Sequence, residues 1–146
     1  MRGLPGSGKS TYVKRNFPGA HIVSADALRV KPDGSYMYDP SKEQEIHGKC
    51  IRDYVALITR SFIDEATARS ELVVVDNTNL SAWEVAPYYT TAAAYGHDVR
   101  ILEVSADLDK AFERNLHGVP RDIFDIMVRR HADDGFPSHW RREWIK

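Results

Sequence analysis

Short apolar runs alternate with longer segments in which apolar positions recur every three or four residues. Residues 72–75 are four consecutive apolar residues, three of them β-branched, and residues 21–24 and 99–104 are further strand candidates. A continuous apolar run is typical of a strand buried on both faces of a parallel sheet. Strands that alternate with helices predict βαβ units, and hence a three-layer α/β fold with a parallel sheet.

The longest periodic segment opens at Asp39-Pro40-Ser41, where Asp39 can cap a helix and Pro40 suits its first position. Its apolar positions continue through Phe62 and Ile63 and predict one helix that ends near Arg69. Cys50 lies on the apolar face of this helix, and we interpret it as a core residue. Other helices are expected at residues 9–16, 81–95, 107–115 and 119–132, with a surface loop at 31–38 and a loop or short helix around Trp140 and Trp144.

The most informative motif is the segment Gly3-Leu4-Pro5-Gly6-Ser7-Gly8-Lys9-Ser10, which fits the P-loop pattern G-x-x-x-x-G-K-[ST] in full. Its glycines let the backbone approach a phosphate closely, and its N–H groups join the N-terminus of the next helix as an anion site. Lys9 can supply a charge to the β- and γ-phosphates, and the Ser10 hydroxyl suits Mg²⁺. Nucleotide binding is therefore expected, and a plain glycine-rich turn before a helix is the alternative.

The apolar strand that should lead into this loop is absent, because only Met1 and Arg2 precede Gly3. Either the sequence is a fragment whose start is trimmed, or the domain folds without its usual central strand. We favour the first interpretation, since a missing central strand leaves residues 72–75 with an unpaired edge.

Polar side chains follow two of the expected strands, at the sheet edge where ligands of such folds bind. Asp26 follows residues 21–24 and can accept a proton from an attacking hydroxyl, while Arg29, one helical turn later, can bind a phosphate of the acceptor. An N-cap aspartate and a solvated arginine are the alternative. Asp76 follows residues 72–75, where P-loop enzymes keep a carboxylate that supports Mg²⁺; an Asx-type turn is the alternative there.

Residues 114–132 are a candidate helical lid over the nucleotide. Arg114 and Arg121 flank the break His117-Gly118-Val119-Pro120 between two expected helices. Either arginine could neutralise charge that develops on the transferred phosphoryl group. Arginines on helix surfaces are usually just solvated, which is the alternative for each.

Composition narrows the classes of function. The length suits a single domain, residues 1–146, and 42% apolar with 28% charged residues is ordinary for a globular protein. A net charge of −1, from 20 basic and 21 acidic side chains, excludes a strongly basic nucleic-acid coat but not a local basic groove. No apolar run approaches the ~20 residues of a membrane span, and a single cysteine makes no internal disulfide. A cytoplasmic location, without membrane contact or an obligate protein partner, is therefore expected.

In combination, these segments resemble the kinase domain of polynucleotide 5′-hydroxyl kinases, of both the phage type and the eukaryotic kinase/phosphatase type. They are most similar to the small stand-alone P-loop relatives of these enzymes. The shared elements, in this order, are Gly3–Thr11, Asp26-x-x-Arg29, Val75-Asp76-Asn77-Thr78-Asn79-Leu80, and Arg114-Asn115 before a Gly-Val-Pro segment. The resemblance implies a three-layer P-loop NTPase/kinase fold, ATP with Mg²⁺ as the donor, and a 5′-OH end of DNA or RNA as the acceptor.

The resemblance also implies residue roles. Asp26 matches the general base and Arg29 the ligand of the acceptor phosphate, with Asn79 on the acceptor side as well. The donor-phosphate ligands correspond to Gly3, Pro5, Gly6, Ser7, Gly8, Lys9, Ser10 and Thr11, and the metal ligands to Ser10 and Asp76. The phage enzymes have the sequence Asp-Thr-Asn where this chain has Asp76-Asn77-Thr78-Asn79. The correspondence between Asp76 and the aspartate of the phage enzymes is therefore ambiguous. The lid arginine of the phage enzymes corresponds to the position of His117-Gly118 in this chain. The role of the lid arginine therefore stays open between Arg114 and Arg121.

The expected function is transfer of the ATP γ-phosphate to a hydroxyl, with a nucleic-acid 5′-OH end as the favoured acceptor. A kinase of a hydroxymethylated DNA base or of a small molecule, an NTPase that uses water, and a nucleotide-binding module without phosphotransfer are the alternatives. The basic tail, with Arg129, Arg130, Arg141, Arg142, Trp140 and Trp144, could stack bases and contact phosphates. It could equally be an amphipathic segment packed by its tryptophans.

Overall fold

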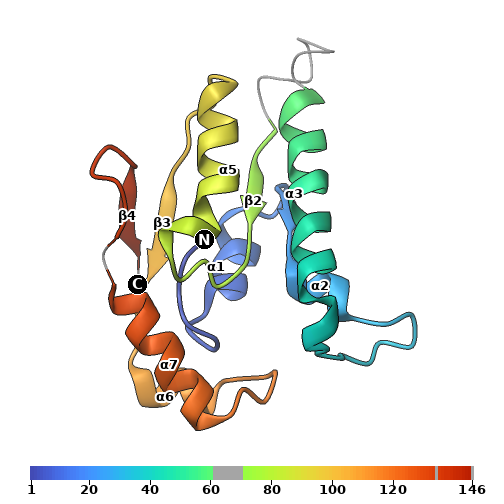
Figure 1. Ribbon diagram of the computed structural model, residues 1–146, viewed down its shortest axis with the longest axis vertical. Helices are drawn as coiled ribbons and strands as arrows, with labels where there is room; N and C mark the ends of the chain where they lie inside the picture. Colours follow the sequence, from blue (N-terminus) through green and yellow to red (C-terminus); the bar gives the residue numbers. More distant parts are fainter. Residues whose placement is uncertain (61–70, 134, 146) are drawn as a thin grey trace.

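The structure is a computed structural model that describes residues 1–60, 71–133 and 135–145 (Figure 1). Strands and helices alternate along the chain, and every strand pair is parallel. β1 (His21–Val23) pairs with β2 (Val73–Val75), and β3 (Ile101–Val104) pairs with β4 (Arg142–Ile145). The parallel α/β organisation predicted from the apolar runs is confirmed, although the strands are shorter than the runs that predicted them.

Most helices lie close to the predicted ranges. They are α1 (Lys9–Asn16), α2 (Ala25–Arg29), α3 (Glu43–Thr59), α5 (Ala82–Ala94), α6 (Leu108–Glu113) and α7 (Arg121–Ala132), with a 3₁₀ turn η1 (Pro40–Lys42) before α3. However, α2 is an additional short helix, and the long helix begins at Glu43, because Asp39 caps a separate 3₁₀ turn before it. Asp107 caps α6 by accepting from the Lys110 N–H at 3.0 Å. The predicted continuation of the long helix through Phe62 and Ile63 to Arg69 lies outside the described residues. No helix in the described ranges is long and apolar enough to cross a membrane.

Residues Arg142–Ile145 form a strand, β4, so the prediction of a loop or short helix around Trp140 and Trp144 was wrong. β4 aligns with β3, with Arg142 opposite Ile101 and Ile145 opposite Val104. Its residues do not alternate between apolar and polar, so the sequence pattern does not indicate a strand. Pairing with β3, rather than burial of one face, stabilises this edge strand. Trp140, just before β4, is buried and stacks on Tyr89 with ring centroids 4.5 Å apart, whereas Trp144 is 64% exposed.

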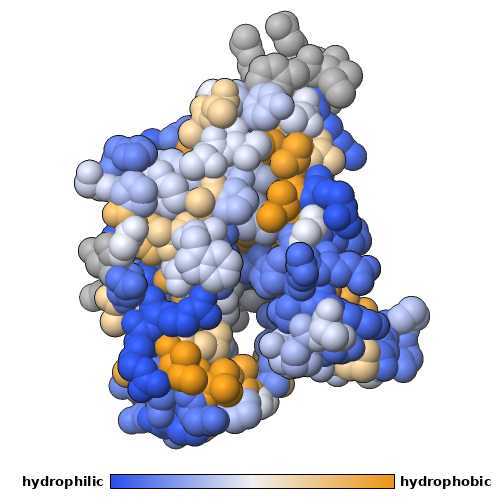
Figure 2. Space-filling model, viewed as in Figure 1, coloured by the Kyte–Doolittle hydropathy of each residue, from blue (hydrophilic) through white to orange (hydrophobic). Residues whose placement is uncertain are grey.

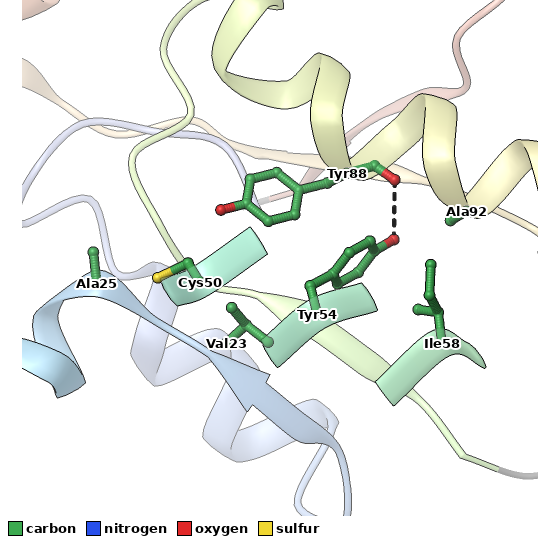
Figure 3. Packing of buried hydrophobic residues seen from close by; sticks show 7 residues of the cluster. All are labelled: Val23, Ala25, Cys50, Tyr54, Ile58, Tyr88 and Ala92. Carbon is green, nitrogen blue, oxygen red and sulfur yellow. Dashed lines mark hydrogen bonds between the residues drawn. The ribbon is translucent and has the colours of Figure 1, made fainter. Parts of the chain in front are cut away.

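The main hydrophobic core lies between α3, α5 and the β1–β2 pair (Figure 3). Its buried members are Val23, Ala25, Cys50, Tyr54, Ile58, Tyr88 and Ala92. Cys50 is fully buried with a free thiol, so its predicted place in the core is confirmed. The Tyr54 hydroxyl donates to the Tyr88 carbonyl oxygen at 3.1 Å, which joins the two helices through a buried polar contact.

At the centre of the sheet, β2 and β3 belong to separate strand pairs. Among the described residues no strand lies between them; Arg2 makes one parallel bridge to Glu103, and the Met1 amino group donates to the Val75 carbonyl oxygen at 2.8 Å. A cavity of about 700 Å³ adjoins this region, and its lining includes all of β2 as well as Ile101. Among the described residues, β2 therefore pairs with β1 alone.

Candidate active site

The glycine-rich loop leads from residue 2, which is bridged to β3, into the N-terminus of α1. Gly6 has a φ of 71° and Gly8, the N-cap of α1, a φ of 98°, both in the left-handed region that favours glycine. A Cβ on Gly6 would lie 1.9 Å from the Ala111 carbonyl oxygen, so the loop packs directly on α6. No side chain from the described residues caps α1, which leaves its first N–H groups available to an anion.

The Lys9 side chain lies along the inside of this loop. Its ammonium group donates to the carbonyl oxygens of Gly3, at 2.9 Å, and Leu4, at 2.8 Å. Burial lowers the pKa of Lys9 to about 8, while the charges of Asp76 and Asp26 act in the opposite direction. The Lys9 cation therefore lies within electrostatic range of both carboxylates that the sequence singled out.

Two buried oxygen atoms beside the loop lack a hydrogen-bond partner within the described part of the chain, Asp76 Oδ1 and Ser7 Oγ. The backbone N–H of Asp76 donates to the Val23 carbonyl oxygen at 2.8 Å, so this residue follows directly on the paired end of β2. Buried polar atoms are nearly always paired in folded proteins, and unpaired oxygens at an anion-type loop favour a site for a bound group.

The buried Asp76 Oδ1, together with the hydroxyl of Ser10, fits a magnesium ion bound together with phosphates. Carboxylate and hydroxyl oxygens are the ligands that Mg²⁺ prefers, and in such sites it takes most of its ligands from phosphates and water. Asp76 and the exposed Ser10 are the residues present for this role. No group of three or more His, Cys, Asp or Glu side chains gathers in the described residues as a metal site of its own.

Asp26 lies in the first turn of α2, directly after β1. Its Oδ1 accepts hydrogen bonds from Arg29 Nη1 at 2.6 Å and from the Tyr36 hydroxyl at 3.0 Å, and its Oδ2 lies 3.3 Å from His117 Nε2. Burial and the neighbouring Asp26 charge raise the pKa of Tyr36 to about 12, so its hydroxyl stays protonated and donates. The Asp26 side chain is nevertheless 46% exposed, which leaves it oriented and accessible.

Arg29 is held by two carboxylates through three of its nitrogen atoms. Its Nε and Nη2 donate to the two oxygens of Glu43, at 3.0 and 2.6 Å, and its Nη1 donates to Asp26. Although burial acts to lower the pKa of Arg29, its hydrogen bonds and charge interaction with Glu43 raise it above the ordinary value. A phosphate on an acceptor therefore has to compete with Glu43, whose part in the site the sequence did not indicate.

Two asparagines after β2 hold the framework of the site. Asn77 Oδ1 accepts from the Ala25 N–H at 2.8 Å and so ties the ends of β1 and β2 together. Asn79, predicted on the acceptor side, is buried with a φ of 48°, and its amide donates to the Met1 carbonyl oxygen at 2.8 Å. The structure therefore directs the Asn79 amide to the backbone beside the loop.

The two lid arginines lie in different surroundings. Arg114 is exposed at the C-cap of α6, and its backbone comes close to Gly6 of the loop. Arg121 pairs with Asp125 at 3.1 Å and Asp109 at 3.5 Å. Arg121 is thus paired with carboxylates of α6 and α7, whereas Arg114 lies exposed beside the loop.

The basic tail is largely paired with acidic side chains of the same molecule. The pairs are Arg130–Glu84 at 3.2 Å, Arg141–Asp98 at 2.5 Å and Arg142–Glu103 at 2.5 Å. Arg129 is exposed. The tail therefore packs and pairs within the fold, with Trp140 as its buried anchor, and presents little free positive charge.

Comparison with known proteins matches most of the chain to one family. The model of the AAA_33 family, described as an AAA domain, matches residues 1–118. Human NEDD4-binding protein 2 is 29% identical over 142 residues, covering 90% of this chain and 7% of that protein. A putative bifunctional polynucleotide kinase/RNA ligase of Autographa californica nuclear polyhedrosis virus is 32% identical over 128 residues, covering 77% of this chain and 17% of that protein.

The fold is similar to a solved kinase structure. The Mycobacterium tuberculosis APS kinase CysC, in complex with AMPPNP and APS, superposes with a TM-score of 0.56 over 98% of this chain and 84% of that chain, at 19% identity. By contrast, the chain spans less than a fifth of the length of either curated relative.

Proposed function

The chain belongs to the AAA_33 family of AAA domains and has the α/β fold of a P-loop kinase, and from this premise we propose that it transfers the γ-phosphate of ATP to the 5′-hydroxyl end of DNA or RNA. The observation that carries the proposal is the convergence of three groups at one site. These are the loop with Lys9, the buried and unpaired Asp76 Oδ1, and the oriented, accessible Asp26. Similarity to a protein named as a putative polynucleotide kinase/RNA ligase supports the nucleic-acid acceptor.

In this proposal each residue of the site has its own role in one phosphoryl transfer. The N–H groups of the loop and the Lys9 ammonium bind the β- and γ-phosphates, and Ser10 and Asp76 hold Mg²⁺, which neutralises phosphate charge when bound. Asp26 accepts the proton of the acceptor hydroxyl as its oxygen bonds to the γ-phosphorus, and the bond to the β–γ bridging oxygen breaks to release ADP. Arg114 stabilises the charge on the transferred group. The chain acts as one domain whose residues 114–132 form a lid that excludes water.

Labelled ATP tests the substrate assignment directly. We expect the protein to transfer label from [γ-³²P]ATP to an oligonucleotide with a 5′-hydroxyl, and not to the same oligonucleotide with a 5′-phosphate. Paired DNA and RNA oligonucleotides of one sequence then give the preference between the two. Absence of label on both 5′-hydroxyl oligonucleotides would remove the nucleic-acid acceptor from the proposal.

The Asp26→Asn variant tests the general base. It keeps the shape of the side chain but accepts a proton poorly, so turnover should fall at least about 100-fold while ATP affinity stays unchanged. Asp53→Asn, an exposed change on α3, is the matched control and should keep full activity. Full activity in the Asp26 variant would exclude Asp26 as the base, and unchanged ATP hydrolysis without an acceptor would favour an NTPase that uses water.

A small-molecule hydroxyl is the second candidate acceptor. It is supported by the fold similarity to a kinase crystallised with APS, and by the paired, nearly neutral charge of the molecule. The same labelling reaction with nucleosides or adenosine 5′-phosphosulfate in place of the oligonucleotide separates the two, because label then appears on the small molecule alone. ATP binding without transfer to any of these acceptors would favour a non-catalytic nucleotide-binding module.

A further inference from the structure

The connection between α6 and α7 reaches across to α2 and contacts the candidate base. His117, in this connection, places its Nε2 3.3 Å from Asp26 Oδ2. Its ring stacks on Tyr36, with centroids 4.2 Å apart and an interplanar angle of 25°, and the Tyr36 hydroxyl donates to Asp26 Oδ1. One residue of the lid therefore contacts both the carboxylate and the side chain that orients it.

The connection is built as a closed turn that presents His117. The Asn115 amide donates to the Val119 carbonyl oxygen at 2.9 Å, and Gly118 has a φ of 64°, so the backbone folds back on itself around His117. Leu116, next to it, is 92% exposed, which is consistent with a turn that projects from the helices. Figure 2 shows an opening between the region of α6 and α7 at the lower left and the region of α2 at the lower right. The His117 contacts join these two regions.

An exposed histidine–aspartate pair contributes little by itself. Here the stack on Tyr36 fixes the plane of the imidazole, and this places its Nε2 within ion-pair distance of Asp26 Oδ2, at 3.3 Å. Asp26 Oδ1 is used by Arg29 and Tyr36, while Oδ2 has His117 as its one described partner and keeps a second lone pair. Arg29 and Tyr36 thus hold Oδ1, while the turn places His117 beside Oδ2, the oxygen that can still accept from a hydroxyl.

We propose that His117 is a positioning residue that couples docking of the lid to the orientation of Asp26. When the turn is docked, His117 and Tyr36 hold the carboxylate so that its remaining lone pair faces the acceptor hydroxyl. This role rests on the proposed function of Asp26 as general base, whereas the docking of His117 on Tyr36 can be measured without any acceptor.

Steady-state kinetics with the 5′-hydroxyl oligonucleotide test the positioning role. Because small misplacement of a catalytic group is costly, His117→Ala should lower kcat about tenfold and leave the KM for ATP unchanged. His117→Gln should recover kcat to within about threefold of the wild type, since the glutamine amide can donate from near the Nε2 position. His139→Ala, an exposed histidine outside the site, is the control and should behave as wild type. An unchanged kcat in His117→Ala, or no recovery in His117→Gln, overturns the positioning role.

Nuclear magnetic resonance separates failure of this inference from failure of the proposed function. In the stack, the ring current of Tyr36 shifts the His117 ring-proton resonances, which are assigned by their loss in His117→Gln. Tyr36→Leu should move them toward unstacked values, while Tyr38→Leu on the same loop should leave them in place. Resonances unmoved by Tyr36→Leu overturn the docking, whatever the enzyme phosphorylates. A wild type that labels no acceptor while these resonances respond instead overturns the proposed function alone.

Discussion

Two tyrosines that face each other in the core differ in what their hydroxyls do. The Tyr54 hydroxyl donates to a carbonyl oxygen of α5, whereas the buried Tyr88 hydroxyl has no hydrogen-bond partner among the described residues. Tyr54→Phe should therefore lower the free energy of unfolding by about 1 kcal/mol. Tyr88→Phe removes an unsatisfied polar group, so it should be neutral or stabilising. Urea unfolding of the two variants and the wild type measures both, and equal losses in the two would contradict the assignment.

His131 in α7 should make the stability of the protein sensitive to acid. Burial lowers its pKa, and the charges of Arg2, Lys9 and Arg142 act in the same direction, opposed by Glu103. The unfolded chain therefore binds a proton near pH 6.5 that the folded chain resists, so stability is full above that pH and declines as the pH falls through it. His131→Gln should flatten the decline in unfolding free energy between about pH 7 and 5.

Denaturant unfolding at several pH values measures the decline. His139→Gln changes an exposed histidine and should keep the wild-type pH dependence. If the His131 and His139 variants follow the same curve as the wild type, His131 is not the group responsible.

The residues of the site that the sequence predicted are those with a local signature. The loop with Lys9 and Ser10 is recognisable from spacing, and Asp26 and Asp76 from their places after apolar runs. Glu43, Tyr36 and His117 carry no such signal, because only the packing of α2, α3 and the α6–α7 turn brings them to Asp26 and Arg29. Glu43 lies in the first turn of α3, where acidic residues are common because they stabilise the positive end of the helix dipole.

At the scale of elements, the contact between the glycine-rich loop and α6 depends on the absence of a side chain at Gly6. A Cβ there would lie 1.9 Å from a backbone oxygen of α6, which cannot move without moving the helix. Gly6→Ala should therefore separate the loop from α6 and weaken ATP binding by at least about tenfold, which is about 1.4 kcal/mol. Titration of a fluorescent ATP analogue measures the affinity.

Gly34→Ala is the matched control for this change. Gly34 also has a positive φ, of 82°, but a Cβ there would meet nothing within 4 Å. It therefore carries the same kind of backbone penalty without the clash, about 1–2 kcal/mol of stability. Equal ATP affinity in the two variants would contradict the expectation that the packing of Gly6 on α6 is needed for ATP binding.

Helices whose first residues carry a capping pattern were predicted well from the sequence. The strand β4, which depends on a partner distant in the sequence, was not. α5 begins with a capping box of Ser81 and Glu84, and α6 begins at the cap Asp107. β4 has no comparable signal, since two of its four residues are charged and one is an exposed tryptophan. It is a strand because β3 offers it a free parallel edge.

Across the whole molecule, a buried ion network joins the loop end of the chain to the sheet and to α7. Glu103 of β3 is fully buried and accepts from Arg2 Nη1 at 2.5 Å and Arg142 Nε at 2.5 Å. Arg2 Nη2 also donates to the carbonyl oxygens of Leu80, at 3.0 Å, and His131, at 2.6 Å. The network therefore ties residue 2 to β3, to β4 and to α7 through buried polar contacts.

Removal of one partner of the Arg2–Glu103 pair should lower the free energy of unfolding more than removal of both partners. Glu103→Leu leaves the buried Arg2 guanidinium without its carboxylate, so the free energy of unfolding should fall by about 3–5 kcal/mol. Arg2→Leu combined with Glu103→Leu replaces the pair by apolar groups and should recover part of that loss, because the fully buried Arg2 guanidinium is no longer left without its carboxylate, although Arg142 still loses its contact with Glu103. A double-mutant cycle in urea measures the coupling. Additive losses in the double variant would mean that the two side chains stabilise the fold independently, and that the sheet is held together at its centre by packing instead of by this ion pair.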